Sequence, residues 1–80
     1  MSVKLVFLGK LADLSGVPEM LVPGPLDWTG LLAALPGPLG EGARGDKVKL
    51  ALNGKILSDK TALSAKEGDE VALLPPVSGG

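Results

Sequence analysis

Eighty residues suffice for one small domain, and the 45% apolar composition, with one Phe, one Trp and no Tyr, predicts a core of aliphatic side chains. The chain has no Cys and no His, which argues against a disulfide framework, a thiolate metal site and histidine-based catalysis by this chain alone. Its net charge is −1 and its eight basic residues are scattered singly, so we expect no nucleic-acid partner.

Membrane association is not expected either. No apolar run approaches the roughly 20 residues of a membrane-spanning helix, and the N-terminus lacks the charged and apolar regions of a secretory leader. We therefore expect a cytoplasmic protein. Because the chain has no Cys and no His, we also expect it to bind no metal and no cofactor itself.

The first segment with a regular pattern is residues 3–8, whose β-branched and large apolar side chains predict a strand that ends at Gly9. Val3, Leu5 and Phe7 share one face of this strand, and the other face is also rather apolar. The turn-forming residues between 10 and 18 predict that residues 19–22 return as the second strand of a hairpin.

A helix is predicted next. Asp27 is a suitable N-cap, and the four following apolar residues at helical spacing are predicted to face the core: Trp28, Leu31, Leu32 and Leu35. The prolines at 36 and 38 end this helix, because proline lacks the backbone donor and clashes with the preceding turn. Residues 39–47 are glycine-rich and are predicted to be a connection with at most a brief turn of helix.

The clearest local signal is a second hairpin. Residues 48–52 alternate with Val48, Leu50 and Leu52 inward, and Asn53-Gly54 is a strong two-residue turn signal before residues 55–57. A polar crossing with an apolar step at residues 62–63 then leads to a last strand at 70–74. The order predicts an α+β domain at 1–74, a mixed sheet of four to five strands with one main helix packed on one face.

The C-terminal segment 75–80 is predicted to be an extended reactive tail, with a free carboxylate on Gly80 as the reactive group. Glycine pairs leave the backbone slim and free in φ, which suits insertion into another protein's active site. Six residues span up to about 20 Å. The predicted partner-binding residues are those that lead to Gly80: Pro75, Pro76, Val77, Ser78 and Gly79. The alternative is that the prolines only end an edge strand and the glycines are passive.

Two further surfaces are candidates for partner contacts. The acidic residues Glu67, Asp69 and Glu70 are expected to lie next to the root of the tail as a docking patch for basic residues of a partner, although a solvated turn explains them equally well. Apolar residues on the outer face of the sheet are the second candidate, with part of the set expected to be core: Val6, Leu8, Ala72 and Leu74.

The element order and the ending together resemble the β-grasp, ubiquitin-like sulfur carriers, and most closely the small subunits of molybdopterin synthase. The most specific part is residues 68–72 leading into Pro75-Pro76-Val77-Ser78-Gly79-Gly80; residues 4–8, 11–13 and 52–54 fit more loosely. The glycines and prolines in the middle of the chain depart from the family pattern.

The resemblance implies a chemistry for Gly80. In that family a ubiquitin-activating-like adenylyltransferase uses ATP to adenylate the terminal carboxylate, and a sulfur donor protein converts it to a thiocarboxylate. The large synthase subunit then takes the tail into its active site, where sulfur is transferred to a pyranopterin precursor in molybdenum cofactor biosynthesis. The chain would thus be a carrier subunit of a sulfurtransferase complex, without an active site of its own.

Three alternatives remain open from the sequence. The carrier for thiazole formation in thiamine synthesis shares the fold and the Gly-Gly end, although the residues 75–78 argue against it. A ubiquitin-like modifier would be joined to lysines of other proteins through Gly80. A non-reactive interaction module would not need Gly80 at all.

Overall fold

The computed structural model describes residues 2–35, 37–45 and 47–75. Five strands form the main sheet: β1 (Ser2–Phe7), β2 (Glu19–Pro23), β4 (Lys49–Leu52), β5 (Lys55–Ile56) and β7 (Glu70–Leu74). Two short strands form a separate pair: β3 (Leu26–Asp27) and β6 (Ser64–Ala65). The helices are α1 (Lys10–Ser15), α2 (Trp28–Ala34), α3 (Gly37–Arg44) and the 3-10 turn η1 (Lys60–Ala62).

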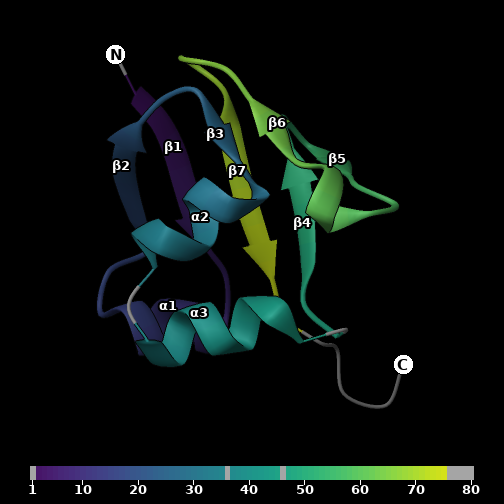
Figure 1. Ribbon diagram of the computed structural model, residues 1–80. Helices are drawn as coiled ribbons and strands as arrows, with labels where there is room; N and C mark the ends of the chain where they lie inside the picture. The colour runs from purple at the N-terminus through teal and green to yellow at the C-terminus, as the bar shows by residue number, and fades with distance from the viewer. Residues whose placement is uncertain (1, 36, 46, 76–80) are drawn as a thin grey trace.

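The main sheet is mixed, with the order β2-β1-β7-β4-β5. The last strand, β7, lies in the middle, parallel to β1 and antiparallel to β4, while β1–β2 and β4–β5 are antiparallel pairs. Figure 1 shows β7 between β1 and β4, with α2 lying across the sheet and α1 and α3 at one end. The fold class predicted from the sequence is confirmed.

One face of the sheet supplies the core. Val3, Leu5 and Phe7 alternate inward from β1 and are at most 2% exposed, as their period-2 spacing predicts. Val71 and Leu73 of β7 and Leu50 of β4 are fully buried beside them. In the second hairpin Val48 is also buried and Leu52 packs against the core, so the inward set predicted for this segment is confirmed.

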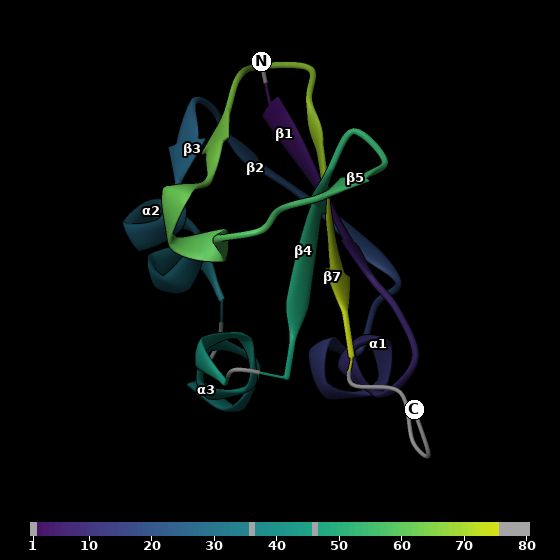
Figure 2. The ribbon, with the colours of Figure 1, turned by 90° about the vertical axis from the view of Figure 1, so that its right-hand side faces the viewer.

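Helix α2 forms as predicted. The carboxylate of Asp27 accepts a hydrogen bond from the backbone N–H of Gly30 at 2.7 Å, which satisfies a donor that the first turn leaves open. Leu31 and Leu35 are buried, and Trp28 and Leu32 pack against the core. Figure 2 shows α2 and α3 on one side of the sheet.

Helices α1 and α3 correct the sequence analysis. The segment after β1 is helical rather than a plain turn, because Leu11 is buried there and Gly16, in the left-handed region with φ 79°, donates to Ala12 O and ends the helix. Residues 39–44, predicted to be part of a connection, belong to the eight-residue helix α3, together with Gly37 and Pro38 from the predicted helix stop. Burial of Leu39 and Ala43 outweighs the low helix propensity of its glycines. Within the described residues, no helix is long and apolar enough to cross a membrane.

Candidate functional site

The root of the predicted tail is the end of β7. Leu73 is fully buried between β1 and β4, and its carbonyl accepts a hydrogen bond from the N–H of Leu8 at 3.3 Å. Leu74 is half-buried and lies opposite Lys49 of β4. The strand that carries the tail is thus the central one, held on both sides, so the point at which the tail leaves the sheet is fixed by the fold.

Gly9 lies directly against this root. Its φ of +55° belongs to the region that L side chains rarely adopt, and a Cβ built on it would lie 3.1 Å from Cγ of Pro75. The turn between β1 and α1 therefore has no side chain where Pro75 passes. Sequence analysis used Gly9 only as the end of a strand, because its contact joins residues far apart in the chain.

Pro75 is half-buried and is the last residue that the structure describes. The remaining predicted site residues, Pro76, Val77, Ser78, Gly79 and Gly80, lie outside the described residues. The domain boundary at 74/75 and the role of the tail therefore stay predictions.

The acidic residues Glu67, Asp69 and Glu70 do not lie at the root of the tail, and the expectation that they adjoin it is wrong. Glu70 begins β7 opposite Lys4, whereas the tail leaves at the other end of the strand. At a rise of about 3.3 Å per residue, the strand separates these two ends by about 13 Å. Figure 1 shows β7 running from this turn towards α1 and α3.

Asp69 instead connects two turns. Its carboxylate accepts a hydrogen bond from the N–H of Lys66 at 2.8 Å and another from Nδ2 of Asn53 at 3.1 Å. Asn53 Oδ1 in turn accepts from the N–H of Glu70 at 2.9 Å. The Lys66 N–H, and then the Asn53 amide, hold the pKa of the Asp69 carboxyl below its ordinary value of 3.8. The acidic turn has a structural role that its charge pattern did not indicate.

One row of apolar side chains crosses four strands on the outer face of the sheet, which also carries the ion pair of Lys4 with Glu19. Val6 of β1 lies opposite Ala72 of β7, Ala72 opposite Ala51 of β4, and Ala51 opposite Ile56 of β5. Ile56 is 65% exposed. We call this set, which crosses the sheet in a single line, the outer row: Val6, Ala72, Ala51 and Ile56.

The four residues predicted for an outer-face interface lie outside the core cluster: Val6, Leu8, Ala72 and Leu74. Leu8 is 40% exposed and the other three are half-buried. Sequence analysis missed Ala51 and Ile56 because their place in the row depends on the pairing of β4 with β7. It also missed Leu21, which is 69% exposed and pairs with Lys4 on the same face.

The structure shows no metal centre in the part of the chain that it describes, where no three His, Cys, Asp or Glu side chains are grouped closely enough to hold an ion. Three features lie near the end of β7: the strand end from which the tail continues, Gly9, which leaves room for Pro75, and the apolar outer row of the sheet to which β7 belongs.

Comparison with known proteins shows the family to which the chain belongs. The model of the ThiS family matches residues 5–80, nearly the whole chain. This chain belongs to the ThiS family. No curated protein sequence matches the chain significantly.

Solved structures agree with the ThiS-family assignment. SAMP1 from Haloferax volcanii is 28% identical, with each chain covered in full and a TM-score of 0.72. A chain from the complex of subunits 1 and 2 of the molybdopterin-converting factor from Helicobacter pylori 26695 is also 28% identical, with full coverage of both and a TM-score of 0.68. The HVO 2177 protein of Haloferax volcanii, 24% identical over the whole of this chain and 87% of its own, shares the fold with a TM-score of 0.79. The resemblance to ubiquitin-like sulfur carriers is thereby confirmed.

Proposed function

We propose that this chain is the sulfur carrier subunit of a molybdopterin synthase, acting in the cytoplasm. The observation that carries the proposal is the ending Pro75-Pro76-Val77-Ser78-Gly79-Gly80 on the central strand of a ThiS-family fold. The neighbour from Helicobacter pylori, which occurs in a complex of the two converting-factor subunits, supports a large subunit as the partner.

The chemistry explains why a chain without Cys or His can serve this reaction. A carboxylate is a poor electrophile, and joining it to AMP from ATP supplies a good leaving group at Gly80. Sulfur from a donor protein then displaces AMP and leaves a thiocarboxylate, which is ionised and nucleophilic as a thiolate is. The adenylyltransferase, the sulfur donor and the large subunit supply the acid, base and charge stabilisation.

We place the docking surface for the large subunit on the outer sheet face. Ile56 and Leu21 expose apolar side chains on this face, and Val6 and Ala72 are half-buried there, with Ala72 on the strand from which the tail leaves. If the globular domain docks on the large subunit through this face, the strand end at Leu74 is held at a fixed place on the partner. Only the last few residues of the tail then need to enter the active site of the large subunit. This lowers the ordering cost of insertion.

The test is genetic and uses two readouts in the organism that carries the gene. Deletion of the gene, or of the Gly80 codon alone, is expected to abolish molybdoenzyme activity and to leave growth without thiamine unchanged. A thiamine requirement with normal molybdoenzymes would contradict the proposal and indicate the thiazole-forming carrier.

A second function is favoured by one specific observation. SAMP1 from Haloferax volcanii, also known from a second structure as small archaeal modifier protein 1, has the same 28% identity to this chain as the converting-factor subunit. Use as a protein modifier predicts lysine-linked conjugates of this chain in cells, detected with an N-terminal epitope tag and absent when Gly80 is deleted. Unchanged function without Gly80 would contradict both proposals.

A further inference from the structure

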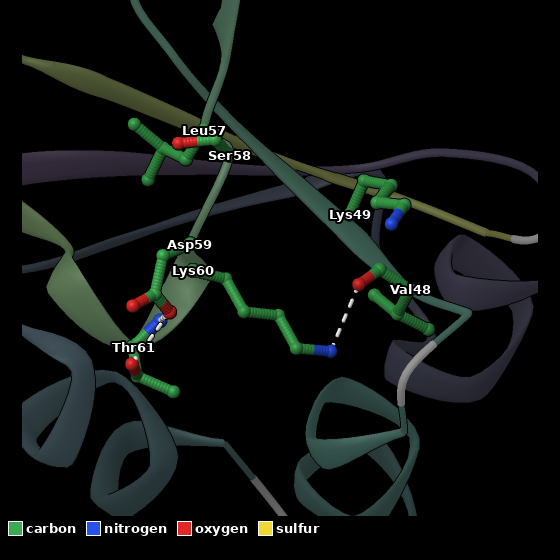
Figure 3. Close-up of a pocket in the computed structure, with 7 residues that line it drawn as sticks. All are labelled: Val48, Lys49, Leu57, Ser58, Asp59, Lys60 and Thr61. Atoms are coloured by element: carbon green, nitrogen blue, oxygen red, sulfur yellow. Dashed lines mark hydrogen bonds between the residues drawn. The ribbon is translucent and has the colours of Figure 1, made fainter.

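The side chain of Lys60 is surrounded by backbone carbonyl groups from a distant part of the chain. Its Nζ donates to Ala43 O and to Val48 O, each at 2.8 Å, and also to Gly45 O. Figure 3 shows Lys60 extending from the η1 segment across a cleft to the carbonyl of Val48. The Nζ also lies 5.7 Å from the centre of the Trp28 ring, within the range of a cation–π contact.

The three carbonyl groups lie at the end of α3 and in the loop that follows it, where the backbone attracts a positive charge. Helix α3 ends at Arg44, and the carbonyls of a helix's last turn have no partner within the helix and lie at the negative end of its dipole. The loop then turns back, with the N–H of Val48 donating to Gly45 O at 3.2 Å, so carbonyls on both sides of the turn lie around one point. We call the oxygens of Ala43, Gly45 and Val48 the carbonyl cage.

The cage matches one chemical group closely. A primary ammonium has three N–H donors and a positive charge, and the carbonyl oxygens and the aromatic face around Lys60 Nζ suit both. A guanidinium has its donors in a plane, and an acylated lysine has one N–H and no charge. The cage therefore selects the unmodified ammonium form of lysine.

We propose that the carbonyl cage is a primary-ammonium site that Lys60 fills from within the same chain, and that its occupation withholds Lys60 from acyl transfer. Acylation joins the acyl carbon to the lone pair of a free amine, expels the leaving group with its bonding electrons, and releases a proton to solvent. Lys60 has to leave the cage and lose a proton before this attack. A second copy of this chain, joined by the modifier chemistry considered above, is then attached through other lysines.

The same cleft contains a matched control. Lys49 also lines it but is exposed, and among the residues that the structure describes its side chain makes no hydrogen bond or ion pair. Lys49 and Lys60 therefore line the same cleft and differ in exposure and in whether the ammonium is held by carbonyl groups.

The first experiment measures acetylation of each lysine by limiting acetic anhydride on the full chain, followed by peptide mass mapping. We expect Lys60 to react at least about tenfold more slowly than Lys49 in the folded protein, because the cage must open first, and equally fast in urea. Reaction of Lys60 within about twofold of Lys49 in the folded protein would overturn the proposal.

The second experiment separates an ammonium site from simple burial. In Lys60→Ala the cage is vacant, and methylammonium chloride is expected to raise the thermal midpoint above that in equimolar tetramethylammonium chloride, which has the same charge and no N–H donor. Wild type should show no such difference. Equal effects of both salts on the variant would overturn the proposal, and the acetylation result stands on wild type alone should the variant fail to fold.

Discussion

Asn53 offers the sharpest test of how the two turns at the far end of the sheet are held together. It occupies the left-handed region with φ 51°, and its amide contacts both the Asp69 carboxylate and the Glu70 N–H. In Asn53→Ala both side-chain hydrogen bonds are lost, at about 0.5–1 kcal/mol each for exposed groups. Alanine in the left-handed region adds about 1 kcal/mol. We expect a total loss of about 2–3 kcal/mol.

Asn53→Gly is the matched control, because glycine adopts positive φ without strain and also lacks the amide. Its expected loss is about 1–2 kcal/mol, that of the two amide contacts alone, because the relief of backbone strain offsets the greater freedom of glycine in the unfolded chain. Urea denaturation of both variants, analysed with a common slope, measures the difference. Equal losses would refute the backbone part of the reasoning, and losses below about 0.5 kcal/mol in both would refute the contribution of the amide contacts.

Three further predictions concern the core, the acidic turn and the outer row. Leu50→Ala should lower the free energy of unfolding by about 2–5 kcal/mol, since Leu50 is fully buried; a loss below about 1 kcal/mol in urea denaturation would contradict this packing. The pKa of Asp69 is lowered on folding, so its contribution is present above the ordinary value and is lost as pH falls through the folded pKa. Urea midpoints of Asp69→Asn should therefore vary less than those of wild type between about pH 5 and pH 2, and parallel curves would contradict the assignment. Ile56→Lys should weaken binding to the large subunit at least about tenfold in calorimetry while Lys55→Ala does not, and equal binding of both variants would remove the outer row from the interface.

Much of the fold follows from local sequence signals. Period-2 burial in β1, the Asp27 cap of α2 and the Asn53-Gly54 turn each depend on residues close in the chain, and each is confirmed. Local signals give the wrong secondary structure where packing between residues far apart in the sequence determines it. The glycines of α3 favour a loop locally, whereas burial of Leu39 and Ala43 in the core favours a helix, and the ammonium of Lys60 donates to the carbonyl of Ala43 near the helix end.

Some features of the candidate site can likewise be predicted from the sequence, and others depend on the fold. The ending 75–80 is visible in the sequence because it is a contiguous motif. The contact of Gly9 with Pro75 and the outer row depend on which strands are neighbours, and a sequence alone does not give that order. The acidic turn was misplaced for a related reason: nearness in sequence to the tail becomes distance in space once an extended strand lies between them.

Intact mass spectrometry of the purified chain tests the central claim most directly. The chain is incubated with ATP, the activating enzyme of its own organism and a sulfur donor, and a chain lacking Gly80 serves as the control. The account predicts a mass gain equal to the replacement of one oxygen by sulfur, present only in the full chain. An unchanged mass with an activating enzyme that is active on another carrier would contradict the proposed sulfur carrier.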